Sequence, residues 1–262
     1  MGTGRPSFNK PGSAFWPHLD SSGWIMKVSI VTDTGNIRSR NEDSYLVDTA
    51  RGLFAVCDGM GGHRGGDVAS RLAVRTIHAW IKANPSDQSI NLVEGAIQQA
   101  NHKVWEASQG NPDLRGMGTT ATVALIGENR LFMGHVGDSA LFRISNNHIE
   151  KLSRDHTLAE QMVSKGLLSE EECRSCAYNH ILTRAVGIAP QVQVDSCEVP
   201  LSSGDAILIC SDGLSDLLTP QDMLAIYQEY PRDLDKIARE MVQTALARGG
   251  YDNITLILLL ID

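Results

Sequence analysis

The sequence predicts an α+β domain in which strands and helices are segregated along the chain and pack in layers. Short apolar and β-branched runs cluster near residues 28–57 and again over 119–152. Apolar residues spaced three and four apart, as in helices, are confined to the segments between and after these clusters. This segregation favours a layered α+β domain, because a doubly wound sheet would alternate strands with helices.

The chain begins with a segment, residues 1–25, that we expect to be poorly ordered because it is rich in Gly, Pro and Ser and has no hydrophobic period. Short strands are then predicted at 28–31, 44–47 and 53–57. Two amphipathic helices follow. Their apolar stripes are Ala69, Leu72, Ala73, Ile77 and Trp80 in the first, and Val93, Ala96, Ile97, Ala100, Val104 and Ala107 in the second.

The second half predicts a strand meander, a polar helical segment and a return to strands. The meander comprises residues 119–126, 130–136, 140–145 and 148–152, with turns at Glu128-Asn129 and Asn146-Asn147. A helix over 158–165 should end at Gly166, and residues 169–172 have the form of a capping box. Strands at 192–199 and 206–209 precede a helix and a final strand over 254–261. The apolar face of that helix consists of Leu234, Ile237, Ala238, Met241, Val242 and Ala245.

Composition is compatible with one domain over residues 26–262 and excludes several function classes. The 262 residues carry a net charge of −8 without a dense basic window, which argues against a nucleic-acid surface. The longest apolar run, over 254–261, is far shorter than a membrane span, and residues 1–25 lack the apolar core of a signal peptide. Five cysteines without a secretory signal fit reduced thiols. We therefore expect a cytoplasmic protein that binds neither nucleic acid nor membrane.

Three aspartates lie at the ends of apolar strand-like runs. Asp58 and Asp212 follow such runs, and Asp252 precedes one. If the third strand is antiparallel to either of the others in one sheet, the three carboxylates meet at one sheet edge. Crowded carboxylates repel one another, so the cluster either takes up protons or binds a hard divalent cation.

Aspartates after strands also begin ordinary turns, but Asp58 opens a stretch that contains more glycine than a turn requires. Five of the nine residues from 58 to 66 are glycine, which lets the backbone approach a ligand closely. This stretch fits neither the dinucleotide fingerprint nor a P-loop. Residues 116–121 match G-x-G-x-x-A but enter a strand instead of opening a helix, so they predict no nucleotide site.

Six acidic and glycine motifs remain, and they occur in a fixed order. They are Arg38-Ser39-Arg40-Asn41-Glu42-Asp43-Ser44, Asp58-Gly59-Met60-Gly61-Gly62, Gly118-Thr119-Thr120, Gly137-Asp138-Ser139, Ser211-Asp212-Gly213 and Asp252-Asn253. Together they resemble the bacterial form of the metal-dependent protein serine/threonine phosphatases of type 2C. The resemblance covers nearly all of residues 26–262 and implies a four-layer α-β-β-α sandwich, with a central antiparallel β-sandwich flanked by helices.

The resemblance implies two Mn²⁺ or Mg²⁺ ions. Asp58 would bridge them, the Gly59 carbonyl would bind one ion, and Asp212 and Asp252 would bind the other; Asp138 would hold a third ion together with Asp212. A water between the two ions would attack phosphorus directly, without a phosphoenzyme. Phosphate monoesters need such help, since their hydrolysis requires up to ~10²¹-fold acceleration.

Further roles implied by the resemblance belong to Arg38, Glu42 and Asp43. Arg38 would grip the phosphate, because its planar fork bonds two oxygens at once. Glu42 and Asp43 would orient metal-bound water.

Two positions depart from the family pattern. Met60 stands where some relatives carry a proton-donating histidine, so either metal-bound water or a group such as His63 would protonate the leaving group. His63 is equally compatible with a solvated loop residue. Ala140 stands where an arginine is usual.

Residues 154–187 resemble the flap that shapes substrate access in bacterial members. Its expected substrate-facing residues are Asp155, His156, Thr157, Asn179 and Arg184. The middle, residues 173–180, contains Cys173-x-x-Cys176 and departs from the common His-Pro form, so substrate choice transfers least.

The resulting hypothesis is a monomeric phosphatase of phosphoserine and phosphothreonine in proteins, which opposes a eukaryotic-like bacterial serine/threonine kinase. Three alternatives remain: a partner-switching regulatory phosphatase, a catalytically inactive member that only binds partners, and a metal-dependent hydrolase of small phosphoesters. The three clustered carboxylates argue against the inactive binding module.

Overall fold

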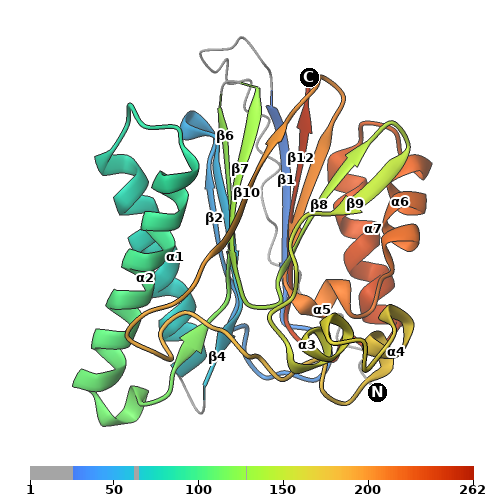
Figure 1. The fold of residues 1–262 in the computed structure, drawn as a ribbon. Helices are drawn as coiled ribbons and strands as arrows, with labels where there is room; N and C mark the ends of the chain where they lie inside the picture. Colours follow the sequence, from blue (N-terminus) through green and yellow to red (C-terminus); the bar gives the residue numbers. More distant parts are fainter. Residues whose placement is uncertain (1–25, 62–64, 128) are drawn as a thin grey trace, which may run out of the picture.

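Two five-stranded antiparallel sheets face each other, and helices cover both outer faces (Figure 1). The structure is a computed structural model that describes residues 26–61, 65–127 and 129–262. The expectations for residues 1–25, His63 and Glu128 therefore lie outside the described residues. Within them, the predicted four-layer α-β-β-α sandwich is confirmed.

The first sheet has the strand order β1-β12-β11-β8-β9. These strands are Met26–Asp33, Ile254–Ile261, Ala206–Cys210, Ala140–Ser145 and His148–Lys151. Every residue of β12 is buried, since the strand lies between β1 and β11 and has both faces covered. This explains why its sequence is continuously apolar and does not alternate.

The second sheet has the strand order β10-β7-β6-β3-β2. These strands are Asp195–Pro200, Arg130–Val136, Ala121–Gly127, Leu53–Cys57 and Ser44–Asp48. A two-stranded ribbon continues beyond it, formed by β4 (Gly59–Met60) and β5 (Gly118–Thr119). The predicted strands are thus confirmed, although β10 begins three residues later than expected and the strand expected over 119–126 is divided at Thr120 into β5 and β6.

The two long predicted helices, α1 (Gly65–Ala83) and α2 (Ile90–Gly110), cover the second sheet. The first sheet is covered by α6 (Pro220–Glu229) and α7 (Leu234–Ala247), and α6 was not predicted. Short helices are α3 (Leu158–Ser164), α4 (Glu170–Ser175) and α5 (Asp212–Ser215), and two 3₁₀ turns occupy Thr49–Arg51 and Pro112–Leu114. The capping box expected at α4 is present.

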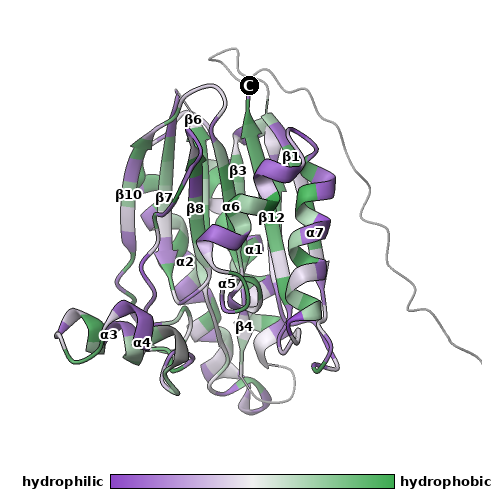
Figure 2. Cartoon of the chain, turned by 90° about the vertical axis from the view of Figure 1, so that its right-hand side faces the viewer, coloured by the Kyte–Doolittle hydropathy of each residue, from purple (hydrophilic) through white to green (hydrophobic). Residues whose placement is uncertain are grey.

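Three apolar cores separate the four layers: one under α1 and α2, one under α6 and α7, and one between the two sheets. Figure 2 shows the hydrophobic residues concentrated on the strands, whereas α7 carries both hydrophilic and hydrophobic residues. In the part of the chain that the structure describes, no helix is long and apolar enough to cross a bilayer.

Candidate active site

The three strand-end aspartates come together, but they come from both sheets. Asp212 follows β11 and Asp252 precedes β12, and these strands pair antiparallel in the first sheet. Asp58 follows β3, which belongs to the facing sheet. The expectation of a single sheet edge therefore holds only for Asp212 and Asp252. The three residues line one cleft of about 1250 Å³ at the end of the sandwich.

Most of the predicted site residues line this cleft. They are Arg38, Glu42, Asp58, Gly59, Asp138, Asn179, Asp212 and Asp252. Asp43 does not line the cleft but lies behind Asp212, where the Ser211 hydroxyl donates a hydrogen bond to its Oδ2 at 2.8 Å.

Burial and mutual repulsion make these carboxyl groups hard to ionise together. Burial raises the pKa of Asp58 well above its ordinary value, and the charges of Asp43, Asp212 and Asp138 raise it further. Burial is also the first cause of the raised pKa of Asp138 and Asp212. It raises the pKa of Asp43 to about 7, although hydrogen bonds from hydroxyl groups act in the opposite direction. A divalent cation among these groups would relieve the repulsion.

The carboxylate oxygens of this cluster fit divalent cations. Among the described residues, Oδ1 of Asp43 and Oδ1 of Asp212 are the buried side-chain atoms without a hydrogen-bond partner. Leaving a buried acceptor unsatisfied costs about 1–3 kcal/mol, which coordination of a cation would recover. Carboxylate and carbonyl oxygens suit Mg²⁺ and Mn²⁺. The donor set therefore fits the ions that the resemblance implies.

Gly59 is required because the backbone packs tightly around it. A Cβ there would lie 2.2 Å from the Gly66 carbonyl oxygen and 2.6 Å from that of Glu42. A Cβ built on Gly66 would in turn lie 2.6 Å from the Gly59 carbonyl oxygen and 2.7 Å from Oε2 of Glu42. The Gly59 carbonyl and the Glu42 carboxylate thus both lie against the backbone at Gly66.

Arg38 stands at the mouth of the cleft, held by Asp252. Its Nη2 donates to Oδ2 of Asp252 at 2.7 Å, and 56% of its side chain is exposed. Asn253 fixes the loop that carries it: the side-chain Nδ2 donates to the carbonyls of Thr34 and Arg40, and its Oδ1 accepts from the Glu42 amide. The guanidinium is therefore accessible to an anion while its base is anchored.

Residues of the motifs Gly118-Thr119-Thr120 and Gly137-Asp138-Ser139 hold the end of β3 in place. The Asp58 amide donates to Oγ1 of Thr120 at 2.8 Å, and Oγ1 of Thr119 donates to the Asp58 carbonyl at 2.7 Å. Oγ1 of Thr120 also lies 2.7 Å from Oγ of Ser139, the residue after Asp138. Asp58 and Asp138 are thereby linked through buried hydroxyls.

Four predicted flap residues, Asp155, His156, Thr157 and Arg184, lie at the base of the flap and outside the cleft lining. The Gly137 amide donates to Nδ1 of His156 at 3.0 Å, so Nδ1 carries no proton. The proton of the neutral imidazole is therefore on Nε2, which donates to Oδ2 of Asp195 at 3.0 Å. Burial lowers the pKa of His156, in accord with this neutral tautomer.

The other three residues make local contacts in the same region. Arg184 pairs with Asp195, Asp155 pairs with Lys151, and Thr157 caps α3. In the flap, Asn179 reaches the cleft, together with His180 and Leu182.

The cleft lining also contains residues that were not predicted as site residues, among them His180, Asp216 and Tyr251. Asp216 lies four residues after Asp212, a spacing that places both side chains on one side of a helix. That signal was available, but α5 is too short to show a hydrophobic period. Burial and the charge of Asp212 raise the pKa of Asp216 to about 7.

Comparisons with known proteins agree with this geometry. The sequence profile of the protein phosphatase 2C family matches residues 37–249. A serine/threonine phosphatase, stp, of Listeria monocytogenes serotype 4b (strain F2365) is 34% identical over 240 residues, which cover 89% of this chain and 95% of that protein.

Crystal structures of bacterial phosphatases share the fold. The serine/threonine phosphatase PstP/Ppp of Mycobacterium tuberculosis superposes with a TM-score of 0.84 at 31% identity, covering 90% of this chain and 98% of that chain. The PstP catalytic domain in complex with two manganese ions gives a TM-score of 0.82 at 30% identity, covering 91% and 99%. On its profile match, its relatives and its fold, this chain belongs to the protein phosphatase 2C family.

Proposed function

We propose that this protein hydrolyses phosphoserine and phosphothreonine on proteins, with two divalent metal ions bound by Asp58, Gly59, Asp212 and Asp252. Asp138 would contribute to a third ion. The observation that carries the proposal is the convergence, in one cleft, of repelling carboxyl groups with the exposed guanidinium of Arg38.

When bound, the two ions would supply a strong nucleophile at neutral pH and neutralise charge on the phosphoryl oxygens. The chain's own residues position the substrate. Arg38 would bond two phosphoryl oxygens through its fork, and its ion pair with Asp252 holds the guanidinium at the cleft. Glu42 would accept hydrogen bonds from water in the cleft and so orient it, whereas Asp43 would act from outside the cleft lining, through its hydrogen bond with Ser211.

The substrate and partners are part of the proposal. A cleft of about 1250 Å³ has room for a phosphorylated side chain together with neighbouring residues of a protein segment. We assign residues 26–262 to one catalytic domain and residues 154–187 to its flap. A serine/threonine kinase that phosphorylates the same proteins is the expected counterpart, and the enzyme is expected to act as a cytoplasmic monomer.

The test compares p-nitrophenyl phosphate with a phosphothreonine peptide, each with Mn²⁺ and with a chelator. We expect Mn²⁺-dependent turnover of both substrates, and a loss of at least ~10²-fold in Asp58→Asn because a carboxylate that would hold the ions is removed. Absence of Mn²⁺-dependent turnover would refute the enzymatic proposal. A strong preference for the small ester would favour a small-phosphoester hydrolase instead.

A further inference from the structure

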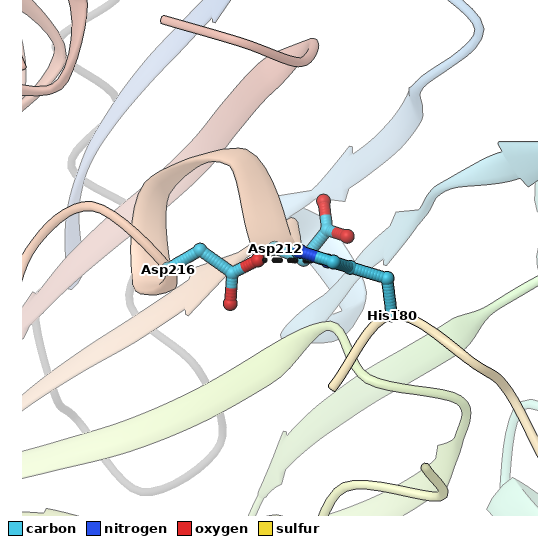
Figure 3. Close-up of side chains that lie close together, drawn as sticks. All are labelled: His180, Asp212 and Asp216. Atoms are coloured by element: carbon cyan, nitrogen blue, oxygen red, sulfur yellow. Dashed lines mark ion pairs between the residues drawn. The ribbon is translucent and has the colours of Figure 1, made fainter. Parts of the chain in front are cut away.

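His180 brings a nitrogen ligand from the flap to the edge of the aspartate cluster. Ligand atoms of His180, Asp212 and Asp216 all lie within 4.8 Å of one another, and Nδ1 of His180 is 3.2 Å from Oδ2 of Asp216. Figure 3 shows the imidazole reaching from the flap toward both carboxylates, which lie at the two ends of α5: Asp212 is its first residue and Asp216 follows its last. Two separate segments of the chain thus supply one group of potential ligands.

The backbone presents His180 in a turn that is anchored to the flap. The Ile181 amide donates to the Tyr178 carbonyl at 3.2 Å, which places His180 inside the turn. The Leu158 amide, at the first residue of α3, donates to the Ile181 carbonyl at 2.8 Å. The position of the imidazole is therefore coupled to α3 and to the rest of the flap.

A second observation points to a ligand at this place. Oδ1 of Asp212 is shielded from solvent and, within the described ranges, has no hydrogen-bond partner. His180 is 65% exposed, so a cation could enter from the mouth of the cleft and reach the carboxylates behind the imidazole. The group therefore combines an unsatisfied buried acceptor with an accessible nitrogen ligand.

The ligand chemistry distinguishes between cations. Mg²⁺ and Ca²⁺ prefer oxygen ligands, and Mg²⁺ keeps much of its water shell. Imidazole together with carboxylates favours first-row transition ions, whose affinities rise from Mn²⁺ toward Zn²⁺ and Cu²⁺.

We propose that His180, Asp212 and Asp216 form a site for a divalent transition-metal ion, in which the flap itself supplies a ligand. Binding of the ion would hold the flap against α5, and the site would discriminate against Mg²⁺. The inference rests on the proposed function only in sharing Asp212, and its test does not depend on turnover.

A simple ion pair is the competing explanation, and the chain contains a matched control for it. His102 lies 3.1 Å from Glu106 on the exposed side of α2, as a histidine–carboxylate pair. In the part of the chain described, the His180 group brings potential ligand atoms of three residues within 4.8 Å of one another, and His102 belongs to no such group.

The experiment uses the full chain without a histidine tag, loaded with Mn²⁺. Pulsed electron spin resonance detects the ¹⁴N nucleus of an imidazole bound directly to Mn²⁺. We expect ¹⁴N modulation in the wild type and in His102→Ala, and its loss in His180→Ala and His180→Gln. In equilibrium dialysis, the weakest class of bound Mn²⁺ should lose at least ~10-fold in affinity in both His180 variants, whereas Mg²⁺ binding stays unchanged.

Flap protection provides a separate readout. Trypsin cleavage after Lys165, an exposed flap residue, should slow when Mn²⁺ is added to the wild type but not when it is added to His180→Ala. Wild-type ¹⁴N modulation that persists in both His180 variants, or equal Mn²⁺ binding by all four proteins, would overturn the proposal. A protein that binds Mn²⁺ as expected but hydrolyses no phosphoester would leave this site intact and refute the proposed function alone.

Discussion

Replacing His135 with glutamine should remove part of the acid sensitivity of the fold. His135 on β7 is completely buried, and its Nε2 lies 3.1 Å from the carbonyl oxygen of Arg154 at the base of the flap. A carbonyl only accepts, so Nε2 carries a proton, and Nδ1 lies 2.9 Å from Oγ1 of Thr122. Burial lowers the pKa of His135 from 6.5 to about 3, and the nearby His156 adds to the effect.

The size and sign of the effect follow from these values. Between pH 6.5 and about 3 the unfolded chain binds a proton that the native protein excludes, so the histidine destabilises the fold as the pH falls. Each pH unit in this range costs about 1.4 kcal/mol, which amounts to almost 5 kcal/mol over the whole range. Glutamine does not titrate. Between pH 7.5 and 4.5, the stability difference should therefore shift by almost 3 kcal/mol in favour of His135→Gln.

The assay is urea unfolding of wild type and variant from pH 7.5 to 4.5, in one ionic strength and with a chelator present. The carboxyl cluster titrates in both proteins, so its contribution cancels in the difference. His148→Gln is the control because His148 is exposed at the start of β9. Parallel stability curves for wild type and His135→Gln would refute the reasoning, since they would mean that His135 accepts its proton in the native state.

Three further substitutions test the cleft. Gly59→Ala should lower the free energy of unfolding by about 1–3 kcal/mol in urea unfolding and reduce turnover, because the added Cβ meets a backbone carbonyl. Gly110→Ala is the control: its Cβ would have nothing within 4 Å, so the free energy of unfolding should change by less than about 0.5 kcal/mol. Arg38→Lys should lower kcat/KM by about 10- to 150-fold, because one charged hydrogen bond to the phosphate is lost. The free energy of unfolding should change by less than about 1 kcal/mol, because the ion pair of Arg38 with Asp252 is exposed. Equal kcat/KM values for variant and wild type would exclude a phosphate contact. Tyr251 is 63% exposed at the cleft and should contact the peptide residues that flank the phosphate. Tyr251→Ala should therefore raise KM for a phosphopeptide by about threefold to tenfold and leave KM for p-nitrophenyl phosphate unchanged. Equal changes in KM for both substrates would contradict this role.

The strands could be predicted from the sequence because many of them are bounded by turns whose residues, such as Gly and Asn, tolerate a positive φ. Asn146 and Asn147, for example, both adopt positive φ in the predicted turn between β8 and β9. Helix α6 was missed even though Thr219 and Asp222 form a capping box around a proline, because its apolar face is weakly marked.

The site was predicted in part for a similar reason. Asp58, Asp212 and Asp252 are placed by strand ends, which the sequence reveals, and by the family resemblance. His180 reaches the cleft through a turn of the flap, and Asp216 through a four-residue helix. Neither of these elements has a repeating pattern, so their three-dimensional positions could not be derived from spacing along the chain.

The division of the aspartates between the two sheets has a consequence for stability. Asp58 and Asp212 are more than 150 residues apart in sequence and stand on opposite sheets of the sandwich. An ion shared by both would act as a non-covalent cross-link between the sheets, closing a very long loop of the chain. Such a link stabilises only the native state, by about 2.7 kcal/mol when the ion is at 100 times its Kd. The same ion would then serve the chemistry and clamp the open end of the sandwich, so metal supply would govern the lifetime of the folded enzyme as well as its rate.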